Sequence, residues 1–197
     1  YYCPSASTSQ CVLRINRAVT DNFTSNQTRV YSNSFTLPST APPGTRYIRI
    51  FVDSAGNIAE SNEGNNNRYD AITVRYPDLF VSASTAPVGT GSVGPGQSIT
   101  VNYSITNSTA GAGFTTKFTV YLYHCPGLST TNCSRRATRS ITDNFATGQT
   151  RSYTSKFTLS PQSSTFLAPS TDYIRIFVDA TNTIRETSET NNNRYDS

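Results

Sequence analysis

The sequence predicts an all-β protein built from two related β-sandwich modules. Three observations support this: a long internal repeat, short segments in which apolar and polar residues alternate, and the lack of any stretch with helical periodicity. Residues 47–70 read YIRIFVDSAGNIAESNEGNNNRYD and residues 173–196 read YIRIFVDATNTIRETSETNNNRYD, at an offset of 126 (173 − 47). Self-similarity over this length indicates two copies of one structural unit.

The strands are clearest in the second copy, where residues 77–85 (PDLFVSAST) predict an opening strand. Residues 98–107 (SITVNYSITN) alternate strictly, with Ile99, Val101, Tyr103 and Ile105 on one face. Residues 117–125 (KFTVYLYHC) place Phe118, Val120 and Leu122 on the inner face. Short strands separated by Gly, Pro, Asn and Ser clusters are typical of an immunoglobulin-like or fibronectin-like sandwich.

Each copy is incomplete when compared with the other. Tyr1, Tyr2 and Cys3 correspond to Tyr123, His124 and Cys125, so the first copy has no counterpart of residues 77–122. The second copy stops before the counterpart of the AITV strand at residues 71–74. We therefore expect immunoglobulin-like modules at residues 1–76 and 77–197, the first lacking its N-terminal strands and the second its last strand.

Two explanations of these open modules remain. The 197 residues are a window on a longer tandem array, or neighbouring subunits complete one another by donating β-strands. Unpaired strand edges are strong templates for pairing between chains, and a head-to-tail contact that does not close produces a filament.

Composition limits the classes of function. Apolar residues make up 35% of the chain, aromatic residues 11% and charged residues only 14%, which suits small cores under a polar, uncharged surface. The net charge is +4, and no basic run is longer than Arg135 and Arg136, so the sequence shows no cluster of basic residues of the kind that binds nucleic acid. No segment is long and apolar enough to span a bilayer, so we expect neither a nucleic-acid partner nor a membrane span.

The four cysteines predict two short-range disulfides. Cys3 and Cys11 are eight residues apart (11 − 3), and Cys125 and Cys133 repeat that spacing (133 − 125). This spacing does not match the paired ligands of structural zinc sites. Disulfides require an oxidising compartment, so the pairs Cys3–Cys11 and Cys125–Cys133 predict a secreted or surface-exposed protein.

The pattern GPGQSITVNYSITNSTAGAGFTTKFTVYLY at residues 94–123, followed by YIRIFVDATNTIRETSETNNN, resembles the CARDB domain, the cell-adhesion-related domain found in bacteria. The first copy carries only the second half of the pattern, ending in FVDSAGNIAESNEGNNN and the AITV strand. The resemblance implies an immunoglobulin-like sandwich in an extracellular prokaryotic protein and supplies no catalytic residues. Paired cysteines and a high Ser, Thr and Asn content depart from the commonest form of the family.

The polar segment after the repeated strand carries acidic residues that could bind calcium. The candidate ligands are Asp53, Glu60 and Glu63 in the first copy and Asp179, Glu186 and Glu189 in the second. Carboxylate oxygens with neighbouring Asn carbonyls suit a hard cation, although the spacing is unlike an EF-hand loop. The structural alternative is that the Asp and Asn side chains cap turns and the Glu side chains face solvent.

We expect no catalytic activity. A glycosidase pair made from these carboxylates would have to occur in both copies and lacks an adjacent aromatic subsite. The only histidine, His124, has no counterpart in the first copy and is more simply explained as a strand residue beside a disulfide.

Five sequons offer candidate sites of N-glycosylation: Asn22, Asn26, Asn102, Asn107 and Asn132. Chance accounts for sequons in a chain this rich in Asn, Ser and Thr, but glycans would also shield an uncharged β surface from lateral aggregation. A second candidate surface is a tyrosine row, Tyr1, Tyr2, Tyr121 and Tyr123, which we expect to face outward and which could bind carbohydrate or a subunit. Cross-strand packing explains these tyrosines equally well.

Together these observations predict a structural subunit of a secreted or surface fibre or stalk of a prokaryote. Its partners would be other copies of itself in a homopolymer assembled by β-strand complementation, with glycans as a further partner and no cofactor other than calcium. The alternative is an adhesin, or a carbohydrate-binding or protein-binding module of a larger extracellular protein.

Overall fold

The computed structural model describes residues 1–85, 93–94, 96–159 and 172–197. The chain forms two compact units, Tyr1–Val74 (unit 1) and Arg75–Ser197 (unit 2). Within the described residues the only helical element is a 3-10 turn, Glu63–Asn65, so the all-β prediction is confirmed. The module boundary predicted between residues 76 and 77 stays a prediction.

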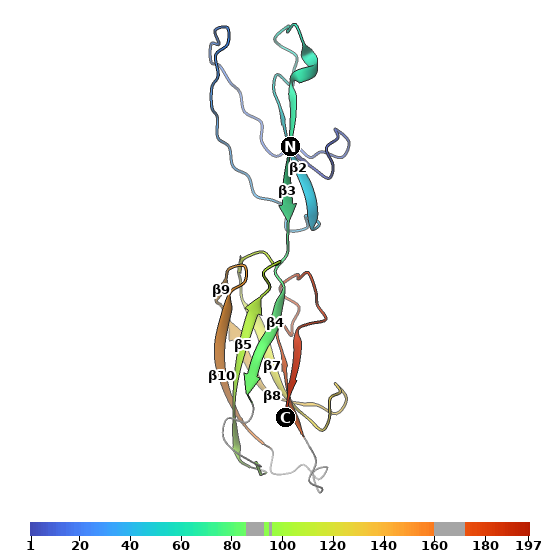
Figure 1. Cartoon of the computed structure of the whole chain (residues 1–197), viewed down its shortest axis with the longest axis vertical. Coiled ribbons are helices and arrows are strands. Elements are labelled where there is room, and N and C mark those ends of the chain that lie inside the picture. The colour runs from blue at the N-terminus through green and yellow to red at the C-terminus, as the bar shows by residue number, and fades with distance from the viewer. Residues whose placement is uncertain (86–92, 95, 160–171) are drawn as a thin grey trace. The chain divides into compact units, whose positions relative to one another are not determined.

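Unit 2 contains two larger antiparallel sheets (Figure 1). The first has the order β10-β5-β4, from β4 (Leu79–Thr85), β5 (Ser98–Asn107) and β10 (Thr150–Thr158). The second has the order β12-β11-β7-β8, from β7 (Phe118–Cys125), β8 (Ser134–Ile141), β11 (Tyr173–Phe177) and β12 (Asn193–Asp196). A short pair, β6 (Phe114–Thr115) with β9 (Asn144–Phe145), completes the unit.

The predicted alternation builds the core of unit 2. The four apolar residues of β5 are all buried, and so are the three of β7: Ile99, Val101, Tyr103, Ile105, Phe118, Val120 and Leu122. Leu79 of β4 and Ile176 of β11 join the same cluster. Burying one such side chain contributes about 1.5–3 kcal/mol to stability, so these faces hold the two sheets together.

Unit 1 contains one three-stranded sheet of order β1-β2-β3, made of β1 (Tyr2–Cys3), β2 (Gly44–Phe51) and β3 (Asn67–Val74). β2 pairs with β3 along its full length, whereas β1 pairs with β2 only at Ile48 and Tyr47. Residues 4–43, all described, contribute no strand. The buried apolar cluster of unit 1 consists of Tyr2, Ala41 and Val74, far fewer than in unit 2.

Both predicted disulfides are formed. Cys3 bonds to Cys11 and Cys125 bonds to Cys133, each with a Cα–Cα distance of 4.2 Å. Each pair ties the end of a strand to the loop that follows it, β1 in unit 1 and β7 in unit 2. Among the described residues there is no helix of the length and apolar character that crossing a bilayer demands.

Candidate functional site

The acidic arm is the polar segment at residues 53–66 of unit 1 and 179–192 of unit 2. It begins at an aspartate in the left-handed region, with φ of 45° at Asp53 and 44° at Asp179. The Asp53 carboxylate accepts hydrogen bonds from the main-chain N–H groups of Asn57 and Ile58, both at 2.9 Å. The Asp179 carboxylate accepts the equivalent two bonds, from Thr183 at 3.0 Å and Ile184 at 2.8 Å. In both arms the aspartate therefore caps a turn.

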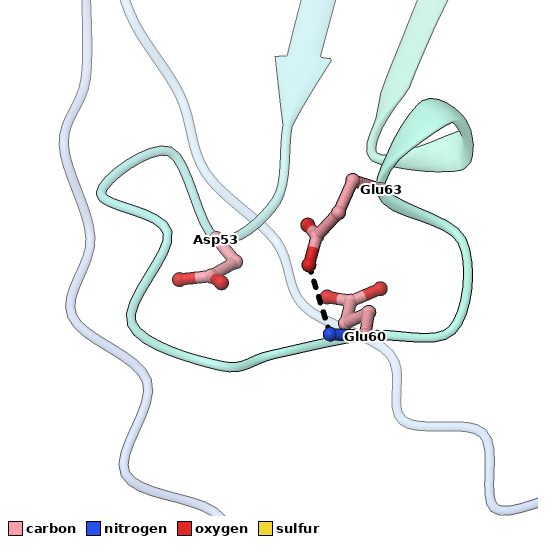
Figure 2. A group of neighbouring side chains, drawn as sticks. All are labelled: Asp53, Glu60 and Glu63. Atoms are coloured by element: carbon pink, nitrogen blue, oxygen red, sulfur yellow. Dashed lines mark hydrogen bonds between the residues drawn. The ribbon is translucent and has the colours of Figure 1, made fainter.

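The second glutamate of each arm has a similar local role. Glu63 Oε1 accepts a hydrogen bond from the main-chain N–H of Glu60 at 2.8 Å (Figure 2), and Glu189 accepts the same bond from Glu186 at 3.0 Å. In unit 1 this brings carboxylate oxygens of Asp53, Glu60 and Glu63 within 4.8 Å of one another. The bonds that hold Asp53 and Glu63 account for the grouping without a metal ion, and calcium binding stays a prediction.

The first glutamate differs between the two arms. Glu186 is only 6% exposed, and its carboxylate accepts hydrogen bonds from the main-chain N–H of Leu79 and from Asn192 Nδ2, the latter at 3.1 Å. Burial raises the pKa of Glu186 to about 8 against the opposing effect of those two donors. Glu60 is half-buried, and among the described residues no group donates to its carboxylate.

Two other residues of the arm of unit 2 form hydrogen bonds with the residues just before β4. The main-chain N–H of Thr187 donates to the Pro77 carbonyl at 2.9 Å, and Asn191 Nδ2 donates to Asp78 Oδ1 at 2.9 Å. The corresponding side chains of unit 1, Ser61 and Asn65, are both exposed. The arm of unit 1 therefore carries residues equivalent to those that position β4 in unit 2.

Several apolar residues of unit 1 are exposed, whereas the equivalent residues of unit 2 are buried. Ile50, Val52 and Phe23 are 50%, 60% and 53% exposed, whereas the equivalent Ile176, Val178 and Phe145 are 0%, 0% and 1% exposed. We define the open face of unit 1 as Val19, Phe23, Ile50, Val52 and Ile58. Their counterparts in unit 2 all belong to the core that β4, β5 and β7 help to form.

The edge of β2 shows the same incompleteness in its pairing. In unit 2, β11 pairs with β7 from Tyr173↔Cys125 to Phe177↔Tyr121. In unit 1 the register Tyr47↔Cys3 and Ile48↔Tyr2 continues only as main-chain bonds between Tyr1 and Arg49. Beyond Arg49, no described residue pairs with this edge of β2.

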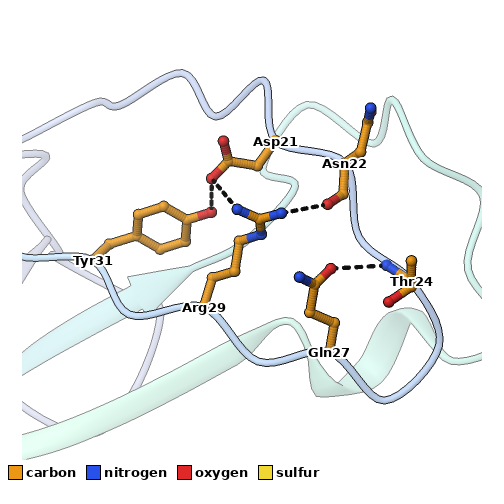
Figure 3. A network of polar contacts seen from close by, with 6 residues as sticks. All are labelled: Asp21, Asn22, Thr24, Gln27, Arg29 and Tyr31. Atoms are coloured by element: carbon orange, nitrogen blue, oxygen red, sulfur yellow. Dashed lines mark hydrogen bonds and ion pairs between the residues drawn. The ribbon is translucent and has the colours of Figure 1, made fainter.

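The turn at residues 21–31 of unit 1 is held by three hydrogen bonds (Figure 3) that the equivalent turn of unit 2 also makes. The residues on either side of the turn in unit 1 form no strand. Tyr31 donates to Asp21 at 2.5 Å, Arg29 donates to the Asn22 carbonyl at 3.0 Å, and Gln27 accepts from the Thr24 N–H at 3.0 Å. The equivalent bonds in unit 2 join Tyr153 to Asp143, Arg151 to Asn144 and Ala146 to Gln149. The sequence therefore encodes this turn locally, and strand pairing on either side depends on the rest of the sandwich.

The sequons fall into two groups. Asn22, Asn26, Asn102 and Asn132 are exposed. Asn107 is fully buried, where its Nδ2 donates to the carbonyls of Ala112 at 2.8 Å and Ala146 at 3.2 Å and its Oδ1 accepts from the Asp78 N–H at 3.0 Å. The amide of Asn107 therefore lies inside the fold, which argues against a glycan at this sequon, and glycosylation of the five sequons stays a prediction. The position of Asn107 in β5, in phase with the buried Ile105, was a signal of its burial.

The expected outward tyrosine row is corrected at Tyr2. Tyr2 is 8% exposed and belongs to the buried cluster of unit 1. Its counterpart in unit 2 is His124, which lies on the same buried face of β7 as Leu122. Tyr121 and Tyr123 are half-buried, and the guanidinium groups of Arg135 and Arg175 lie 4.4 Å and 5.0 Å from their ring centres. Arginine packing therefore covers these rings, which favours the structural explanation.

His124 is part of the scaffold. Its side chain is buried, and its Nε2 lies 3.3 Å from Asp172 Oδ2.

Two antiparallel sheets around one apolar core, with arms that cap turns and position strands, define a β-sandwich module of the immunoglobulin-like class. A model of the CARDB family matches residues 76–196, more than half of the chain, and the chain belongs to this family. This places unit 2 almost entirely inside the matched region and confirms the resemblance predicted from the repeat.

Solved structures give a looser likeness. The CARDB domain of a Pyrococcus furiosus protein, crystallised in complex with di-metal ions, is 20% identical, with a TM-score of 0.43 over 63% of this chain and 88% of that one. A solution structure of the same domain gives 20% identity and a TM-score of 0.41 over 62% and 93%. A b-glucosidase from Erythrobacter marinus gives 14% identity and a TM-score of 0.35 over 63% of this chain and 16% of the enzyme. No curated protein matches the chain.

Proposed function

We propose that the chain is a structural module of a secreted or cell-surface fibre or stalk, in which β-strands of a neighbouring copy cover the open face of unit 1. The observation that carries this proposal is the contrast between Val52, 60% exposed, and its counterpart Val178, which is fully buried. Each apolar residue of the open face is about half exposed, so its complete burial would contribute roughly 1–2 kcal/mol and supply a driving force for association.

Strand edges make the proposed contact specific. The edge of β2 beyond Arg49 offers unpaired main-chain groups beside the open face, so an added strand would gain hydrogen bonds and apolar contacts together. Successive copies joined in this way form a head-to-tail contact, which extends into a filament.

The family and the disulfides support the location. The CARDB match supports an extracellular, adhesion-related β-sandwich module. The bonds Cys3–Cys11 and Cys125–Cys133 persist in an oxidising environment and stiffen the loops at the ends of β1 and β7. Glycans on the exposed sequons would add to the polar coat of such a fibre.

The test combines negative-stain electron microscopy with light scattering of the purified 197-residue protein. We expect elongated assemblies for the native sequence and loss of assembly for the double variant Val52→Ser, Ile58→Ser, whose side chains belong to the open face. The matched control is Leu128→Ser, since Leu128 is 66% exposed on the disulfide loop of unit 2. A monodisperse native monomer, or equal loss in the control, would contradict the proposal.

A further inference from the structure

The acidic arm of unit 2 fixes the first residue of β4, Leu79, and the two residues before it. The Pro77 carbonyl accepts from Thr187, the Asp78 carboxylate accepts from Asn191, and the Leu79 N–H donates to Glu186. Leu79 is fully buried in the core at this point. A slip of one residue would turn Leu79 to solvent, so the three contacts together set the register of the strand.

The arm of unit 1 retains the same elements. Glu60, Ser61 and Asn65 stand at the fixed offset of 126 from Glu186, Thr187 and Asn191. The aspartate-capped turn and the bond from the Glu60 N–H to Glu63 are already formed (Figure 2), so the main chain of the arm holds its shape without an opening strand.

One contact differs between the two arms. Asn192 donates to Glu186 at 3.1 Å, whereas its counterpart Asn66 donates to Glu63 at 3.3 Å. The Glu60 carboxylate therefore lacks both donors that its counterpart receives. Beside it, Ile58 is 64% exposed, whereas Ile184 is 5% exposed in the cluster that contains Leu79.

We propose that the arm of unit 1 binds the opening strand of another CARDB module, an extended Pro-Asp-Leu segment whose leucine N–H donates to the Glu60 carboxylate. The leucine side chain packs on Val52 and Ile58, and the segment's aspartate accepts from Asn65. The inference rests on the proposed function and names the strand that the open face receives.

The opening strand of unit 2 is already engaged within its own unit. β4 pairs with β5 from Leu79↔Asn107 to Thr85↔Asn102, and the arm of unit 2 holds its start. Exchanging this strand out of unit 2 would uncover the core around Leu79. A strand from another module fills unit 1 without that loss.

The test uses a fluorescent peptide with the sequence of residues 76–85, YPDLFVSAST, titrated into the full 197-residue protein and followed by fluorescence anisotropy. The matched control peptide carries N-methyl-leucine at its fourth position, which removes the one N–H that donates to glutamate. We expect saturable binding of the first peptide and at least tenfold weaker binding of the second.

Two protein variants distinguish loss of the Glu60 hydrogen bond from loss of the fold. Glu60→Ala should weaken binding at least tenfold, while Glu60→Gln, which keeps a carbonyl oxygen as acceptor, should stay within about threefold of the native protein. A thermal melt checks that unit 2 unfolds at the same temperature in both variants. Equal binding of the two peptides, or no binding of either, would overturn the inference.

The outcomes distinguish this inference from the proposed function. Assemblies in the microscope together with no peptide preference would remove the inference and leave the fibre. Peptide binding that depends on Glu60, together with a monomeric protein, would retain the inference and remove the fibre.

Discussion

Arg175 Nε donates a hydrogen bond to Asn193 Oδ1 over 2.7 Å, and Arg49 donates the same bond to Asn67 over 2.7 Å in the other unit. Arg175 is buried, with its guanidinium 5.0 Å from the Tyr123 ring and 4.8 Å from the Phe177 ring. A repeated, buried arginine beside two rings therefore joins β11 to β12 in unit 2 and β2 to β3 in unit 1.

Replacement of this arginine should weaken unit 2. Arg175→Lys keeps the charge but loses the planar group that stacks on both rings and bonds Asn193, so we expect a loss of about 1–2 kcal/mol in the free energy of unfolding. Urea denaturation measures it. The exposed Lys117→Arg change is the control and should have no effect beyond about 0.5 kcal/mol. Equal stability of the native protein and Arg175→Lys would refute the role of the stacked guanidinium.

The buried Glu186 should make stability depend on pH. Its pKa is about 8 in the folded state against 4.5 for the ordinary side chain, so between these values the folded chain holds a proton that the unfolded chain has lost. Stability should therefore fall as pH rises from 4.5 to 8. Glu186→Gln should flatten this fall, whereas Glu189→Gln on the exposed side of the arm should not. Melting temperatures across that range give the comparison, and an unchanged slope in Glu186→Gln would count against it.

Reduction of the disulfides should destabilise both units. Each bond closes a loop of nine residues or fewer, from Cys3 to Cys11 and from Cys125 to Cys133, which corresponds to about 2–3 kcal/mol from restriction of the unfolded chain. Calorimetry with and without reductant measures the shift. The double variant Cys125→Ser, Cys133→Ser should lower the transition of unit 2 and make it insensitive to reductant; a transition that still responds would point to another cause.

Asn107 should be essential to the loops around β5. Asn107→Ala removes one acceptor and two donor contacts in a fully buried site, so we expect a loss of about 2–4 kcal/mol. Asn102→Ala, on the exposed face of the same strand, should cost less than about 1 kcal/mol. Chemical denaturation of both variants measures the two free energies of unfolding. Equal losses would mean that the buried hydrogen bonds of the Asn107 amide do not stabilise the fold.

Glycan mapping of the secreted protein gives a separate test of the fold. We expect any N-glycan on the exposed Asn22, Asn26, Asn102 or Asn132 and none on Asn107, because a buried amide cannot reach a transferase. Mass spectrometry of proteolytic peptides resolves the five sites. A glycan on Asn107 would mean that β5 forms differently in the cell.

Alternation predicted the inner residues of β5 and β7 because a strand buried on one face has a period of two, and spacing predicted the disulfides because each pair is local. The same period would have placed Asn107 and Tyr2 inside, had it been extended to them. The role of Glu186 was beyond local patterns, because its donor Leu79 lies 107 residues away. Exposure of Val52 agrees with the open first module that the repeat predicted, although the exposed fraction of each residue required the structure.

The pairing of β2 with β3 has a mechanical consequence. The ladder runs from Gly44↔Val74 to Phe51↔Asn67 in eight consecutive pairs, and β3 ends where unit 2 begins at Arg75. Gly44 and Val74 lie at one end of the ladder, and residues 52–66 join Phe51 to Asn67 at the other end. Tension between Pro43 and Arg75 therefore separates the Gly44↔Val74 pair first and opens the ladder pair by pair, so the mechanical resistance of unit 1 depends on the contacts that residues 1–43 make with β2.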